Sequence, residues 1–149
     1  MDYQNFNNFC GVLSQRSLFV NAAKEMLKIN DRERAVELLD MCQECVPEEN
    51  YPLDITYLGF SNEYMVLDMI ETYYVAGAKD KALELAKKFS EQIFPSAEFF
   101  LGYYDYAKRE FDACYNCISY MAELADHFGD TDFAKEIRDR FNAMLDLAK

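Results

Sequence analysis

The residues closest to a known chemical motif are two Cys-x-x-Cys pairs, Cys42/Cys45 and Cys114/Cys117. Two such pairs can supply the four thiolates of a tetrahedral zinc site. Both pairs, however, lie in stretches with the apolar spacing of a helix interior, whereas a reactive redox pair favours a helix N-terminus. A free cysteine packs as a small apolar residue. We therefore predict buried core thiols and no metal site, with a zinc site or a thiol-redox site at these four residues as the alternatives.

The remaining ionisable residues give no catalytic pattern. His127 is the only histidine, and no serine or cysteine beside it forms a recognisable nucleophile motif. It stands at the end of an expected helix, where an imidazole interacts favourably with the helix dipole. The 27 acidic residues show no spacing that singles out a general acid–base pair. We expect no catalytic residue, no cofactor and no enzymatic activity.

Composition narrows the possible partners. The chain has 149 residues, 51% of them hydrophobic, and a formal charge of −12, which is typical of a globular acidic domain. A surface for nucleic acid or anionic lipid needs clustered cations, so the acidic composition argues against both partners. No apolar run approaches the ~20 residues that span a bilayer, so we expect no membrane insertion by this segment. The first residues do not resemble a signal peptide, which favours either a cytosolic protein or a piece of a larger chain.

The elements that carry these residues are predicted to be helices. Apolar residues recur at intervals of three and four, and the few glycines and prolines separate the helical stretches. We predict one domain over 1–149 with helical hairpins at about 16–48, 63–95 and 104–147. Insertions are expected at about 51–61, with a short ambiguous strand-like patch at 55–60, and at 96–103. Turns or stops are expected at Asn30, Pro47, Gly77, Pro95 and Gly129.

The hairpins resemble the tetratricopeptide repeat, a helix–turn–helix of about 34 residues. The similarity rests on Ala35, Ala82 and Ala134, which stand early in each second helix, and on the turn glycines Gly77 and Gly129. The expected fold is therefore all-α, with about three antiparallel hairpins stacked as a right-handed repeat array.

A narrower resemblance covers nearly the whole chain. It is carried by the Asn-rich lead-in at 2–9, the segments 34–40 and 71–77, and the ending at 128–136. These motifs resemble the C-terminal soluble region of Bacteroidetes multi-span membrane proteins related to protein O-mannosyltransferases. The resemblance implies a non-catalytic periplasmic domain of a larger membrane protein, whose catalytic residues lie in the membrane part. The alternative is a free-standing cytosolic adaptor of the tetratricopeptide type.

Repeat geometry predicts a binding face. The first helices of stacked hairpins line a concave surface that can hold a protein or an extended peptide. The alternative is a solvated face without a ligand. The predicted face also includes Val20, Leu27, Leu67 and Ser119, and its candidate binding residues are Lys24, Lys28, Tyr64, Glu71, Tyr74, Asn116, Glu123 and His127.

An aromatic cluster lies in the least repeat-like stretch of the chain. Tyr103, Tyr104 and Tyr106 follow Phe99 and Phe100. Aromatic side chains usually pack, so the first interpretation is that the cluster holds the insertion against the hairpins. The second is a binding edge on a loop that a rigid scaffold supports.

Overall fold

The computed structural model describes residues 3–54 and 62–147, with side chains from residues 11 and 63 onward in these two ranges. These residues form six helices and no strand, which confirms the all-α class. The strand-like patch at 55–60 lies outside the described residues. Among residues 3–54 and 62–147, none of the helices combines the length and the hydropathy of a membrane span. The helices are α1 (Tyr3–Lys28), α2 (Arg32–Cys45), α3 (Asn62–Ala76), α4 (Lys79–Gly102), α5 (Tyr104–His127) and α6 (Thr131–Leu147).

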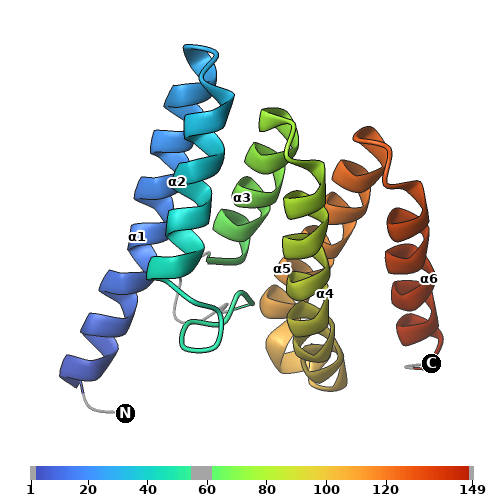
Figure 1. The fold of residues 1–149 in the computed structure, drawn as a ribbon. Helices are drawn as coiled ribbons and strands as arrows, with labels where there is room; N and C mark the ends of the chain where they lie inside the picture. The colour runs from blue at the N-terminus through green and yellow to red at the C-terminus, as the bar shows by residue number, and fades with distance from the viewer. Residues whose placement is uncertain (1–2, 55–61, 148–149) are drawn as a thin grey trace. The chain divides into compact units, whose positions relative to one another are not determined.

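The chain divides into two compact units, Met1–Ala82 and Leu83–Lys149. In unit 1, α1 and α2 run antiparallel and both contact α3 (Figure 1). The turn between α1 and α2 depends on Asn30, whose positive φ of 61° breaks the first helix. Asp31 then caps α2, because its carboxylate accepts the Arg34 N–H at 3.0 Å. The core of unit 1 includes Val20, Ala23, Ala35, Leu39, Cys42, Val66, Ile70 and Tyr73.

A buried arginine ties α1 to the segment that follows α2. The Arg16 guanidinium donates to the carbonyl oxygens of Val46 at 3.2 Å, Tyr51 at 2.5 Å and Pro52 at 3.2 Å. Burial lowers the pKa of Arg16. Guanidinium groups remain charged in proteins, and a buried charge needs hydrogen-bond partners. The three backbone carbonyls supply them. This side chain therefore fixes the course of residues 46–52.

A second polar network links α2, α3 and the start of α4. The Gln43 amide donates to the Tyr73 hydroxyl at 2.7 Å, and that hydroxyl donates to Asp40 at 2.9 Å. Lys81 pairs with the other Asp40 oxygen at 2.5 Å. Burial and the Asp40 carboxylate raise the pKa of Tyr73. The phenol is therefore a neutral structural hydrogen-bonding group.

Two predicted helix limits were wrong. The helix of the first hairpin was expected from about residue 16, but α1 already begins at Tyr3. The second hairpin was expected to stop at Pro95, with an insertion at 96–103, but α4 continues through this proline to Gly102. A proline removes one backbone donor from the helix ladder. The helical apolar spacing continues across the proline, so Ile93, Phe94 and Ala97 are all buried. The free energy gained by burying these side chains offsets the lost hydrogen bond.

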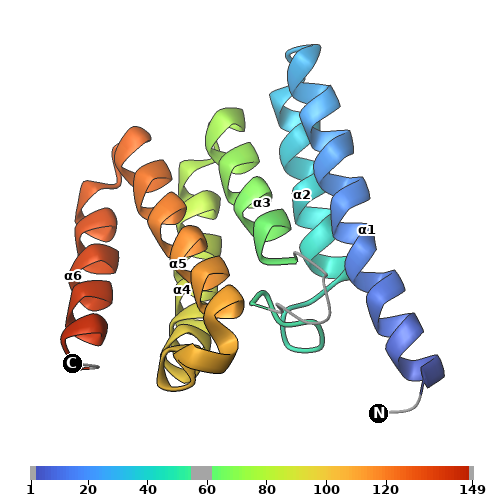
Figure 2. The same ribbon diagram turned by 180° about the vertical axis from the view of Figure 1, so that it is seen from behind.

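Unit 2 contains most of α4, together with α5 and α6 (Figure 2). α5 and α6 pack against each other across a turn at Gly129, which has a φ of 85°. α6 also contacts α4 through Arg140, which lies 4.2 Å from the ring centroid of Phe94 and 3.2 Å from Glu91. The buried residues of α5 and α6 include Cys114, Cys117, Ile118, Met121, Ala134, Ile137 and Phe141.

Candidate functional site

The predicted binding lysines of unit 1 are engaged within the molecule. Lys24 pairs with Asp68 of α3 at 3.0 Å, and Lys28 pairs with Glu25 one turn earlier at 2.5 Å. Both pairs lie at the surface, where such contacts contribute little and exchange with water. The lysines therefore remain accessible, but each has a carboxylate that a ligand would have to displace.

Helix α3 does not present the expected open face. Tyr64 is exposed and Glu71 is half-buried, but Tyr74 is buried. Leu67, and Val20 on α1, were expected on the same open face and are also buried. The prediction of an open face was wrong for these three residues. Tyr74 and Leu67 are buried because α3 is largely apolar and has no single core side. Val20 is buried because α1 packs against both α2 and α3.

The predicted residues of unit 2 lie along α5. Asn116, Glu123 and His127 are all exposed. His127 is the last residue of α5, as expected, and its ring makes an edge contact with Phe128 at 4.8 Å between centroids. This helix-end position fits the structural interpretation of the histidine.

A small groove lies between α5 and α6. Its volume is about 180 Å³, and its lining combines the apolar residues Ile118, Ala122, Ile137 and Phe141 with Ser119, Glu123 and Arg138. Ser119 and Glu123 belong to the predicted binding face, whereas Arg138 was not predicted from the sequence. Arg138 is also paired with Asp126 at 2.6 Å. The groove offers room for one apolar side chain beneath a rim of opposite charges.

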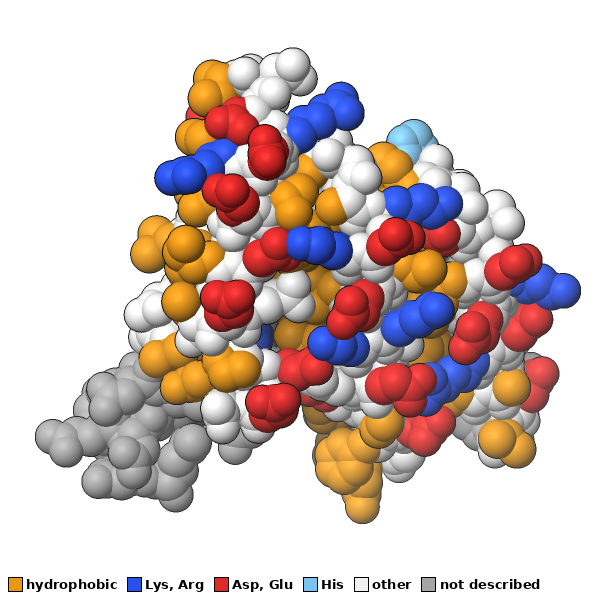
Figure 3. All heavy atoms as spheres, in the orientation of Figure 1, with side chains coloured by type: hydrophobic (Ala, Val, Ile, Leu, Met, Phe, Trp, Pro, Cys, Tyr) orange, Lys and Arg blue, Asp and Glu red, His pale blue; other side chains and the backbone are white. Residues whose placement is uncertain are grey.

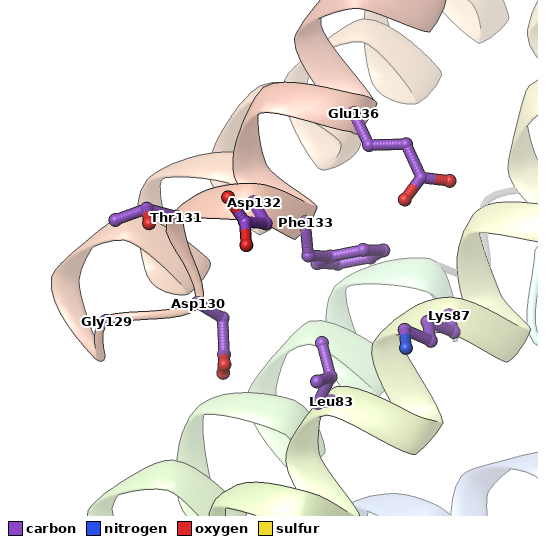
Figure 4. Close-up of a pocket in the computed structure, with 8 residues that line it drawn as sticks. All are labelled: Leu83, Lys87, Gly129, Asp130, Thr131, Asp132, Phe133 and Glu136. Carbon is purple, nitrogen blue, oxygen red and sulfur yellow. The ribbon is translucent and has the colours of Figure 1, made fainter.

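A larger cavity of about 300 Å³ lies at the start of α6. Figure 4 shows the Phe133 ring between the start of α6 and the α4 side chains Leu83 and Lys87. The lining also includes Gly129, Asp130, Thr131, Asp132 and Glu136. These eight residues contain no histidine or cysteine, so the lining offers no thiol nucleophile, and its polar groups are three carboxylates, Lys87 and Thr131.

The four cysteines with described side chains differ in burial. Cys42, Cys114 and Cys117 are buried, Cys45 is exposed, and these four form no disulfide. Burial raises the pKa of the Cys42 thiol to about 11, so the thiolate that would act as nucleophile or metal ligand is disfavoured. The part of the chain that the structure describes holds no group of three or more His, Cys, Asp or Glu placed to bind a metal. The side chain of Cys10 lies outside the described residues.

One buried carboxyl was not predicted from the sequence. Glu63, in the first turn of α3, is 3% exposed, and its Oε2 atom has no hydrogen-bond partner among the described residues. Burial raises the pKa of Glu63 to about 7, with a smaller contribution from Asp54. An acidic residue in a first helical turn is ordinary in sequence, so only the structure reveals its burial.

The most distinctive surface feature is the aromatic corner, which we define as Phe99, Tyr103, Tyr104 and Tyr106. It lies where α4 ends and α5 begins, and its side chains are 61%, 57%, 39% and 92% exposed, respectively. Figure 3 shows hydrophobic side chains protruding at this end of the two helices. The packed interpretation of the tyrosine cluster was therefore wrong for Tyr103 and Tyr106, while Tyr104 packs partly on Phe111 at 5.6 Å between centroids.

Local structure explains why these rings project. Gly102 ends α4, and Tyr103 precedes α5 without a side-chain cap. Ala107 has non-helical backbone angles, with φ −122° and ψ 29°, so a kink follows the first turn of α5. Phe99 and Tyr103 lie together, with ring centroids 5.1 Å apart. Phe99 and Tyr103 thus form a contiguous aromatic pair within the corner.

Comparisons with known protein families, with curated proteins and with solved structures give no match to this chain.

Proposed function

We propose that the chain is a non-catalytic protein-interaction domain and that the aromatic corner is its docking surface. The observation that carries this proposal is the exposure of four neighbouring aromatic side chains on one edge of unit 2. Contiguous exposed apolar patches are uncommon on monomeric proteins and mark interaction sites. Tyrosine and phenylalanine are also enriched in protein interfaces, where a few aromatic residues carry most of the binding energy.

The finer architecture and the cellular setting belong to the same proposal. Successive antiparallel helices of the tetratricopeptide type would present such an edge at a fixed place. The resemblance to membrane proteins related to O-mannosyltransferases supports a periplasmic domain of a larger chain. An immunoblot of fractionated native cells tests this setting. A membrane-bound band much larger than 17.4 kDa is expected, whereas a soluble band near that mass would indicate a free-standing adaptor.

The docking role itself is tested by site-specific photocrosslinking in cells that make the protein. A photoreactive phenylalanine analogue replaces Tyr106, and a matched variant carries it at exposed Asp139 on α6. We expect a discrete covalent adduct from position 106 and none from position 139. The adduct should disappear when Phe99 and Tyr103 are both changed to Ser. If no discrete adduct forms at position 106, or if it survives these two changes, the docking role is wrong.

A further inference from the structure

The chemistry around the aromatic corner points to one kind of partner. Glu98 precedes Phe99, and Asp105 stands between Tyr104 and Tyr106. Both carboxylates are exposed. No ion pair joins either of them to another described residue. The exposed rings are therefore flanked by two available negative charges.

Aromatic faces attract cations, and this attraction is strongest when the cation is partly shielded from water. The chain already makes two such contacts within unit 2. Lys108 lies 5.9 Å from the ring centroid of Tyr104, and Arg140 lies 4.2 Å from that of Phe94. Among the described residues, no Lys or Arg side chain lies over the ring of Tyr103 or Tyr106. Tyr106 is almost fully exposed.

The net charge of the whole chain also favours a positively charged partner. A formal charge of −12 repels acidic polypeptides and anionic lipid, and it speeds the approach of a basic polypeptide. Resting on the proposed docking function, we infer that the aromatic corner binds a basic polypeptide segment. Its Arg or Lys side chains lie over Phe99, Tyr103 and Tyr106 and pair with Glu98 and Asp105.

Binding is measured by titration calorimetry with three synthetic peptides that share a Gly-Ser spacer. One carries three Arg residues, one carries citrulline in their place, and one carries Glu. We expect saturable binding of the Arg peptide alone, weakened by added salt. Changing Phe99, Tyr103 and Tyr106 together to Leu keeps apolar area but removes the rings, and should weaken binding at least about tenfold. The double variant Glu98→Gln/Asp105→Asn should also weaken it.

The matched control changes Leu18 and Ile29 on unit 1, which are also exposed and apolar, to Ser. It should bind the Arg peptide within about twofold of the unchanged chain, because surface changes away from a site are usually silent. Equal binding of the Arg peptide by the leucine variant would overturn the inference, since general acidity would then explain the attraction. Citrulline binding equal to that of Arg would also overturn it.

Three further outcomes separate the inference from the proposed function. If the Arg peptide does not bind but the position 106 adduct still forms in cells, docking stands and the basic partner is wrong. Corner-dependent dimerisation in sedimentation, or corner-dependent flotation with phosphatidylglycerol vesicles, each without peptide binding, would assign the surface to a second copy or to lipid and would overturn the inference.

Discussion

Glu63 shows how one residue makes the molecule sensitive to pH. Its carboxyl has a pKa of 4.5 when solvated and about 7 in the folded chain, because burial disfavours the charged form. Below about pH 4.5 the group is protonated in both states. Between the two values the folded chain holds a proton that the unfolded chain has lost. The free energy of unfolding therefore falls as the pH rises through this window and levels off above pH 7.

Glu63→Gln should remove this dependence. The variant should gain up to about 3 kcal/mol relative to the unchanged chain between pH 5 and pH 8, from the difference between the two pKa values. Urea unfolding followed by circular dichroism at both pH values measures the gain. Glu98→Gln, at an exposed position, is the control and should show no such trend. An equal effect of Glu63→Gln at both pH values would contradict the burial of an ionisable carboxyl.

The structural role of Arg16 could not be predicted from the sequence. An arginine in a helical stretch is normally expected at the surface, because charged residues are rarely buried without partners. The structure supplies the partners as carbonyls from residues 46–52, which the sequence places 30 or more positions away. Only a folded hairpin brings these acceptors to the guanidinium.

At the scale of elements, the apolar periodicity was sufficient to predict helices and most of their turns. Gly77 and Gly129 end helices with positive φ, as expected. The length of α4 was not predicted, because a proline normally ends a helix and only the burial of its neighbours shows that this one does not. The inward position of Tyr74 was missed for a related reason. An apolar helix such as α3 has no polar side to define its orientation.

Two glycines with different backbone conformations, Gly11 and Gly77, allow the assigned helix limits to be tested by matched substitutions. Gly11 lies within α1, and a Cβ added there meets nothing within 4 Å, so Gly11→Ala should raise the free energy of unfolding by about 0.5–1 kcal/mol. Gly77 has a φ of 87°, so Gly77→Ala should lower it by about 1 kcal/mol through backbone strain. Urea unfolding at constant pH compares the two. Shifts of the same sign would contradict the assigned end of α3.

At the scale of the whole molecule, we expect the excess of negative charge to destabilise the folded state more than the ion pairs stabilise it. The ion pairs Lys24–Asp68, Lys81–Asp40, Arg138–Asp126 and Arg140–Glu91 all have side chains at least one-third exposed. Surface pairs contribute only about 0–1 kcal/mol each. Repulsion among the unpaired carboxylates of a chain with a net charge of −12 acts over longer distances and destabilises the folded state.

Added salt should therefore stabilise the protein, although salt weakens its ion pairs. Raising sodium chloride from about 20 mM to about 500 mM shortens the screening length severalfold, so the long-range repulsion falls more than the short contacts do. We expect thermal unfolding at pH 7.5 to shift upward by a few degrees. The triple variant Glu98→Gln/Asp105→Asn/Asp139→Asn should be less responsive, because it carries fewer repelling charges. A downward shift in the unchanged chain would mean that the ion pairs, and not the net charge, dominate its electrostatic stability.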